Sequence, residues 1–124
     1  MTYKLTITPK PAYLHAIVTG VNSRENVERY LNEVMHECIA QNCTRLLIEE
    51  RLEGPRLGTA DVFQIAKNGS HQARGIFDAI AYVDVNAEGE LMEFARTVAN
   101  NYLLPVRLFT SVHEAEQWLI TVDM

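Results

Sequence analysis

The sequence is poor in cysteine, proline and glycine, and it contains no long apolar run. Of its 124 residues, two are cysteine, four are proline and six are glycine. The two cysteines, Cys38 and Cys43, cannot supply the disulfide framework of a small secreted domain, and free thiols are typical of a reducing compartment. No apolar run reaches the roughly 18 residues of a membrane-spanning helix, and the first ten residues carry no signal-peptide pattern. We therefore expect a cytoplasmic protein that does not insert into a membrane.

Basic charge is scarce as well. Eleven Lys and Arg residues stand against 16 Asp and Glu residues, which gives a formal net charge of −5. Nucleic acids and anionic membranes attract positive surfaces, so this balance disfavours both as partners. Hydrophobic residues make up 48% and charged residues 22% of the chain, which is typical of a folded globular protein. A chain of this length forms one domain, and we predict a single domain over residues 1–124.

Motifs for bound groups and for nucleophilic catalysis are missing too. The stretch 54–59 has neither the glycine spacing nor the lysine of a phosphate-binding loop. Cys38 falls on an apolar helical stripe, and no base adjoins Cys43 that would activate its thiol. No histidine lies three or four residues from another, which disfavours a metal pair on one helix; the four are His15, His36, His71 and His113. We expect no metal, no cofactor and no catalytic residue, and predict that the protein is not an enzyme.

The apolar residues recur with periods that predict alternating strands and helices. Asn22 with Glu25, Thr59, and Ser111 with Glu114 have the residue types that begin helices. The expected elements are strands at 1–9 and 13–19, a helix after Asn22 to about 41, a strand at 45–49, a helix from Thr59 to about 70, a strand at 80–83, a helix over 91–99, a strand at 106–109, and a helix after Ser111 through 119.

The resulting order, β-β-α-β-α-β-α-β-α, predicts a single α/β domain with about four helices. The strand at 45–49 has a continuous apolar run, and the strand at 80–83 is apolar as well, which is typical of strands buried on both faces of a parallel sheet. Helices between consecutive strands imply right-handed crossovers and parallel neighbours. The first two strands have no helix between them, so we expect them to form an antiparallel hairpin at or near one edge of a mostly parallel sheet.

This order resembles that of the STAS superfamily, the fold of bacterial anti-sigma-factor antagonists, over about residues 3–121. Three segments carry the resemblance: Leu46-Leu-Ile-Glu-Glu50, Ile80-Ala-Tyr-Val83, and the strand and helix of 106–119 with their Glu-Ala and Trp-Leu pairs. The chain is most similar to the small stand-alone STAS-like proteins of unassigned activity. The resemblance implies a STAS fold and a regulatory module that acts by contact with other proteins.

In the antagonists, an Asp-Ser-Ser-Gly signature opens the second helix, and its second serine is phosphorylated. Leu57, Gly58, Thr59 and Ala60 occupy that place here, so only Thr59 keeps a hydroxyl, at the phosphorylated position. The resemblance therefore implies the fold with more force than it implies the phosphorylation switch.

The role of Thr59 can also be interpreted without reference to the family. A hydroxyl at a helix N-terminus either caps the helix or accepts a phosphate, because the N–H groups there favour an anion. Arg51 and Arg56 flank the preceding loop and either hold such a phosphate or are simply solvated. The candidate regulatory residues are thus Thr59, Gly58, Arg51 and Arg56.

Three functions are compatible with these observations. The first is a non-catalytic cytosolic module of STAS type that acts by protein contact or self-association as a homodimer, switched at the loop before the second helix. The second is a domain that binds a small apolar, lipid-like ligand in a cavity among its helix aromatics. The third is an enzyme that uses the strand-end carboxylates Glu49, Glu50 and Asp84, which a carboxyl pKa raised towards neutrality would favour.

Overall fold

The computed structural model describes residues 3–54, 57–73, 75–84, 93, 96–98, 100–101 and 105–121. Within these ranges the elements are β1 (Tyr3–Pro9), β2 (Leu14–Val21), α1 (Arg24–Ala40), β3 (Arg45–Glu53), α2 (Thr59–Ala73), β4 (Ala79–Asp84), β5 (Val106–Phe109) and α4 (Val112–Thr121). Residues 93, 96–98, 100 and 101 are also helical. The helix expected over 91–99 otherwise lies outside the described residues, as do Met92 and Phe94.

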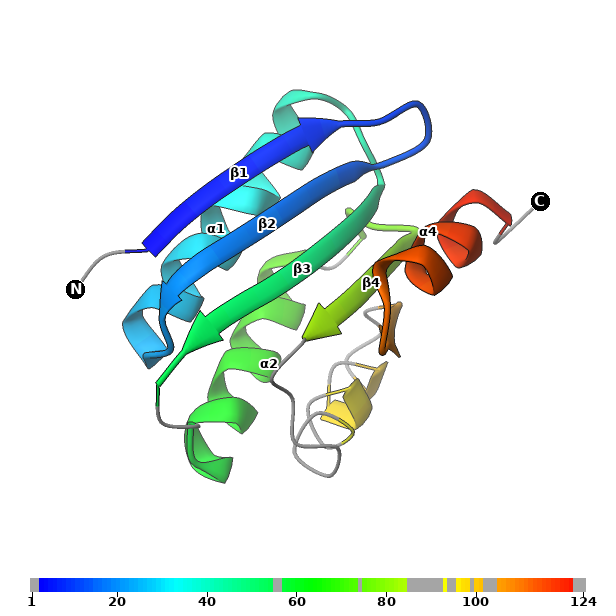
Figure 1. The fold of residues 1–124 in the computed structure, drawn as a ribbon. Helices are drawn as coiled ribbons and strands as arrows, with labels where there is room; N and C mark the ends of the chain where they lie inside the picture. The colour runs from blue at the N-terminus through cyan, green and yellow to red at the C-terminus, as the bar shows by residue number, and fades with distance from the viewer. Residues whose placement is uncertain are drawn as a thin grey trace.

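The five strands form one mixed sheet in the order β1-β2-β3-β4-β5 (Figure 1). β1 pairs with β2 antiparallel, and each later strand pairs with its predecessor in parallel. The hairpin thus places β1 at one edge of the sheet, and the segments 46–49, 80–83 and 106–109 lie side by side and point the same way. The predicted α/β architecture is confirmed.

Helices cover both faces of the sheet, and the sheet separates two hydrophobic cores. α1 and α2 lie behind the sheet in the view of Figure 1, and α4 lies in front of it. Successive side chains of a strand point to opposite faces, so Leu46, Ile48 and Leu52 of β3 join the α1 core while Leu47 joins Ala115 and Leu119 of α4. The continuous apolar run that predicted burial on both faces therefore serves both cores.

The helix caps differ in part from those predicted. Ser23, not Asn22, caps α1, because its Oγ accepts the Asn26 N–H at 3.2 Å. Gly58 precedes α2, and its carbonyl accepts the first helical hydrogen bond, from the Val62 N–H at 3.1 Å. Thr59 is therefore the first helical residue and not the cap that we expected.

The cap predicted for α4 is confirmed. Ser111 Oγ accepts the Glu114 N–H at 3.2 Å. The other end of this helix is held by β3, since Arg45 Nη1 donates to the Leu119 carbonyl at 2.6 Å. A guanidinium at a helix C-terminus satisfies a carbonyl that has no partner within the helix. α4 is thus fixed at both ends on its face of the sheet.

Candidate functional site

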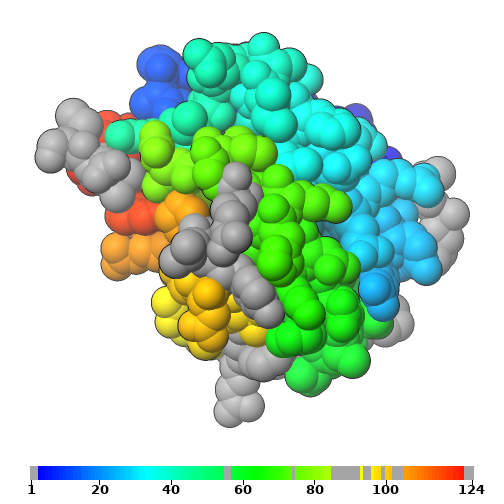
Figure 2. Space-filling model, turned by 180° about the vertical axis from the view of Figure 1, so that it is seen from behind, coloured from blue at the N-terminus to red at the C-terminus, as the bar shows by residue number. Residues whose placement is uncertain are grey.

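A cavity of about 900 Å³ lies between α1, α2 and the sheet face that these helices cover. Figure 2 shows the outside of this face, with α1 in cyan and α2 in green lying next to each other. Pockets that bind small molecules have volumes of roughly 300–1,000 Å³. The described apolar residues that line it are Val27, Leu31, Val34, Met35, Leu46, Ile48, Leu57, Val62, Ile65, Ala66, Ala73, Phe77, Ile80, Val106 and Leu108.

Small residues on α2 leave this space open. Ala66, Gly69 and Ser70 line the cavity, and they recur at three- and four-residue steps on one face of the helix. A methyl group built on Gly69 would meet no neighbouring atom within 4 Å. The Ser70 hydroxyl donates to the Ala66 carbonyl at 2.6 Å and so stays within its own helix. The small residues of α2 therefore contribute to the gap between the helix and the sheet.

A buried carboxyl group, that of Glu50, forms part of the cavity wall. Glu50 is only 6% exposed, and its Oε2 accepts hydrogen bonds from the hydroxyls of Tyr30 and Tyr82. The two phenol oxygens lie 3.3 Å apart. Tyr82 and Asp84 of β4 also line the cavity, and Asp84 faces Glu50 directly in the register of β3 and β4. The carboxyl ends of two parallel strands thus bring two carboxyl groups and a phenol to one wall.

The surroundings of Glu50 change its proton affinity. Burial raises the pKa of Glu50 from 4.5 to about 7, the hydrogen bonds from Tyr30 and Tyr82 oppose this rise, and the neighbouring Asp84 adds to it. Burial also raises the pKa of both tyrosines well above 10, so the phenols stay protonated and donate to the carboxyl. Glu50 therefore gains and loses its proton near neutral pH.

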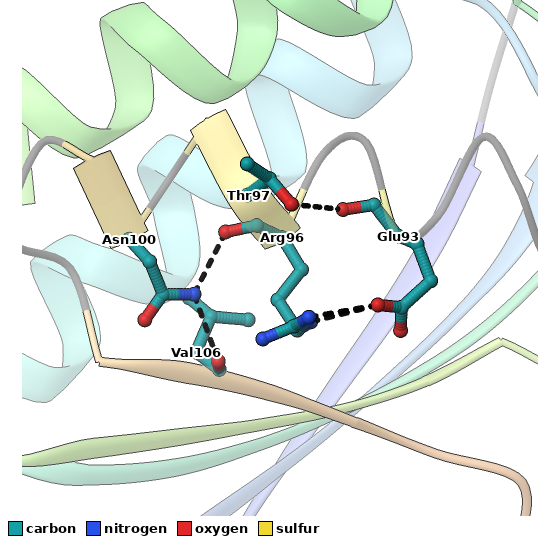
Figure 3. Close-up of polar contacts among 5 residues, drawn as sticks. All are labelled: Glu93, Arg96, Thr97, Asn100 and Val106. Atoms are coloured by element: carbon teal, nitrogen blue, oxygen red, sulfur yellow. Dashed lines mark hydrogen bonds and ion pairs between the residues drawn. The ribbon is translucent and has the colours of Figure 1, made fainter.

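The helical residues before β5 place a charged pair beside the cavity. Arg96, which lines it, is bound to the Glu93 carboxylate at 2.8 Å (Figure 3). The Asn100 side chain donates to the carbonyls of Arg96 and Val106, at 2.7 and 3.3 Å, and so ties this helical segment to the first residue of β5. The hydrogen bonds of Asn100 thus hold Arg96 in place at the cavity.

Glu49 belongs to a different cluster on the opposite sheet face. Its carboxylate oxygens contact His15 Nε2 at 2.9 Å and Arg51 Nε, and Glu49 is 6% exposed. Because neighbouring residues of a strand alternate in direction, Glu49 points away from Glu50. Of the three strand-end carboxylates, the structure brings together only Glu50 and Asp84.

The predicted regulatory residues do not gather at one described point. Thr59 and Gly58 are exposed at the start of α2. The Arg51 guanidinium is engaged by Glu49, and Arg56 lies outside the described residues. A phosphate on Thr59 held by Arg51 and Arg56 therefore stays a prediction.

Sequence reasoning missed the role of the Tyr30 hydroxyl, although Tyr30 is fully buried. The signal was present: two glutamates continue the apolar run of β3, and a tyrosine interrupts the apolar run of β4. A carboxylate in a buried strand requires donors, and the tyrosines supply them. Cys38 is a core residue as predicted, and burial raises its pKa to about 12.

Within the described ranges, no three or more His, Cys, Asp or Glu side chains gather in a way that could hold a metal ion. Among the helices found there, none combines the length and apolar character needed to cross a membrane.

Neither a protein-family model nor a curated protein sequence matches this chain. Among solved structures, the chain is similar to an uncharacterized protein of the DUF3478 family from Shewanella loihica PV-4, which is described as having a SpoIIAA-like fold. The two share 22% sequence identity with a TM-score of 0.57, over 94% of this chain and 93% of the other. The similarity confirms the predicted STAS-type fold, and at this identity it establishes the fold alone.

Proposed function

We propose that this SpoIIAA-like domain is a binding module that takes a small ligand with an apolar body into the cavity between α1, α2 and the sheet. The observation that carries the proposal is the cavity itself, about 900 Å³ with a largely apolar described lining. A volume of this size, in a space that is partly open to solvent, lies in the range of ligand pockets.

The chemistry of the walls agrees with an amphipathic ligand. Leu31, Ile65 and Phe77 offer apolar surface, while Glu50 and Tyr82 offer polar atoms in the wall formed by the sheet. Ligand pockets commonly combine an apolar lining with a few polar groups that orient the ligand. A lipid-like ligand was among the functions compatible with the sequence, but the cavity was expected among helix aromatics. The described aromatic residues that line it are instead Phe77, which precedes β4, and Tyr82 in β4.

A titration of the ¹⁵N-labelled protein with 1-decanol tests the proposal. We expect chemical-shift changes at cavity residues such as Val62 and Ile65, and little change at Ala115 and Leu119 in the core under α4, which does not border the cavity. Absence of shifts up to the solubility limit of decanol would overturn the proposal, as would shifts confined to α4.

A matched pair of variants checks the location. The double variant Ala66→Leu/Gly69→Leu adds bulk to the wall that α2 contributes and is expected to weaken decanol binding about tenfold or more, because the added atoms occupy the ligand's volume. The control Ala60→Leu also replaces alanine by leucine, at an exposed position of the same helix. It is expected to bind decanol as the wild type does. Equal affinity of the double variant and the control would contradict the assignment.

A regulatory module switched at Thr59 is our second candidate, favoured by one observation. Thr59 is exposed at the start of α2, and the same helix forms a wall of the cavity. Modification there would act on the element that borders the ligand. Incubation with cell lysate and ATP followed by mass spectrometry tests this candidate; persistent absence of phosphate on Thr59 counts against it.

Acid–base catalysis is the third candidate, favoured by the pKa of Glu50, about 7. A group that titrates near the working pH suits proton transfer. Such a reaction needs Glu50 within reach of the bound molecule. If the Glu50→Gln variant binds every ligand of the wild type and no ligand is converted by either protein, the catalytic candidate is overturned while the binding module stands.

A further inference from the structure

The two cysteines of the chain lie at the end of α1 and in the turn that leads to β3. Cys38 is fully buried in the last turn of the helix, and Cys43, which follows the helix, is half-buried. We propose that their thiols form a redox-sensitive pair, which hydrogen peroxide oxidises to a disulfide across the end of α1. This inference does not depend on the cavity or on its ligand.

The backbone of the turn brings the two residues together. The Cys43 N–H donates to the Cys38 carbonyl at 2.9 Å. Asn42, which lies between them, has a left-handed φ of 54° and donates its N–H to the Ile39 carbonyl at 3.1 Å. Two such hydrogen bonds around a left-handed residue form a Schellman motif, in which the residue after the left-handed one commonly contacts the helical residue five positions earlier. Those two positions hold Cys43 and Cys38.

The packing of the side chains agrees with the backbone. Cys43 packs against the hydrophobic core cluster to which Cys38 belongs. Burial raises the pKa of Cys38 to about 12, and the Cys43 thiol adds to the rise. Because the electrostatic influence of one group on another falls with distance, this effect places the two thiols near each other. They are neighbours within one core.

Hydrogen bonds from the sheet hold the other side of the turn. The Thr44 carbonyl accepts the Asp78 N–H at 2.8 Å, and the Thr44 hydroxyl donates to the Asp78 carboxylate at 2.7 Å. The Cys43 thiol donates to the Arg45 carbonyl at 3.2 Å. Disulfides form where the backbone already holds two cysteines within bonding range. Since the backbone on both sides of Cys43 is fixed, we expect the cross-link to form by rotation of side chains.

The exposure of the two thiols determines the order of the chemical steps. The Cys43 sulfur attacks one oxygen of the peroxide, the O–O bond breaks, one water leaves, and Cys43 becomes a sulfenic acid. The Cys38 sulfur then attacks the Cys43 sulfur; the S–S bond forms, the S–O bond breaks, and the hydroxyl leaves with the Cys38 proton as a second water. The thiols lose two electrons in all, and the peroxide gains them. Because the pKa of Cys38 is raised, its attack is the slow step near pH 7.

Peroxide treatment followed by alkylation and mass spectrometry tests this chemistry. Trypsin releases both cysteines in one peptide, residues 30–45, which follows Arg29 and ends at Arg45. In the folded protein we expect that peptide to lose both alkylation sites and to be lighter by two hydrogen atoms than the reduced peptide. Cys38→Ala is expected to stop at the sulfenic acid of Cys43, and Cys43→Ala to keep its remaining thiol reduced. A wild type that forms the sulfenic acid without the cross-link, or only disulfides between chains, would overturn the proposal.

An equilibrium measurement separates a pair that the fold brings together from two cysteines that are merely close in sequence. Mixtures of reduced and oxidised glutathione give the ratio of disulfide to dithiol in the folded protein and in urea. We expect this ratio to be about tenfold or more higher in the folded chain. Asn42→Gly accommodates the left-handed conformation and should keep the preference, whereas Asn42→Val disfavours that conformation and should reduce it.

Each other result of this measurement counts against the pair. A ratio in the folded chain equal to or below that in urea would show that the fold does not favour the disulfide. Equal ratios in the two Asn42 variants would show that the turn does not position the thiols. If Asn42→Val does not fold, the comparison of the wild type with and without urea still decides the question.

Discussion

Glu50 is the residue at which this sequence departs furthest from the ordinary pattern of a buried strand. A carboxylate loses much of its hydration when it is buried, and few proteins keep one without partners. Here Tyr30 and Tyr82 supply two donors, and Asp84 lies opposite. Because the donors offset only part of the burial cost, the carboxyl pKa stays raised, at about 7. We interpret the buried Glu50 carboxyl group as one that costs stability and serves function at the cavity.

The raised pKa predicts how stability depends on pH. Glu50 binds its proton more tightly in the folded chain than in the unfolded chain, so the folded state gains stability below about pH 4.5 and loses it as the pH rises through about 7. The loss amounts to at most about 3 kcal/mol between those limits. Urea unfolding of the wild type and of Glu50→Gln from pH 5 to 8 measures it, and the wild type should lose stability relative to the variant. A constant difference between the two would contradict this account.

The tyrosine hydroxyls should tune that pKa. Tyr30→Phe keeps the ring in the core but removes one donor to the carboxylate, so the pKa of Glu50 is expected to rise further. A ¹³C NMR titration of the Glu50 side-chain carboxyl measures the shift. Tyr3→Phe is the matched control, because the Tyr3 hydroxyl binds Glu33 instead. An unchanged Glu50 pKa in Tyr30→Phe would show that the hydrogen bond does not act as described.

At the scale of elements, the helix caps show where sequence reasoning was one residue off. Asn22 and Ser23 are both good capping residues, and the sequence alone does not determine which of them is the N-cap of α1. The structure selects Ser23, and the Asn22 N–H instead donates to the Glu53 carbonyl at 2.7 Å. That contact joins the ends of β2 and β3. The pairing of these two strands therefore determines that Ser23, and not Asn22, is the N-cap.

The cap assignment predicts a measurable cost. Ser23→Ala leaves the Asn26 N–H without its side-chain acceptor, and we expect the free energy of unfolding to fall by about 1 kcal/mol. Ser23→Asp keeps an acceptor at the same place and should restore most of that loss. Chemical denaturation of the three proteins compares them. If alanine and aspartate at position 23 give equal stability, Ser23 does not cap α1.

At the scale of the whole molecule, the topology was predictable and the cavity was not. Apolar runs without alternation predicted parallel strands, and the hairpin followed from the missing helix between the first two strands; both are confirmed. The grouping of Glu49, Glu50 and Asp84 in one site was only partly right, because successive strand residues point to opposite faces and Glu49 contacts His15 and Arg51 instead. The space beside α2 depends instead on how Ala66 and Gly69 meet the sheet. That distance is set by the packing of all the elements together, which no local pattern records.

The most direct test of the central claim is a crystal structure of the protein pressurised with xenon, which enters apolar cavities without needing any polar contact. Our account predicts xenon between α2 and the sheet, in contact with cavity residues such as Ile65, Phe77 and Ile80. A structure in which side chains fill that space, with no xenon among these three residues, would contradict the account.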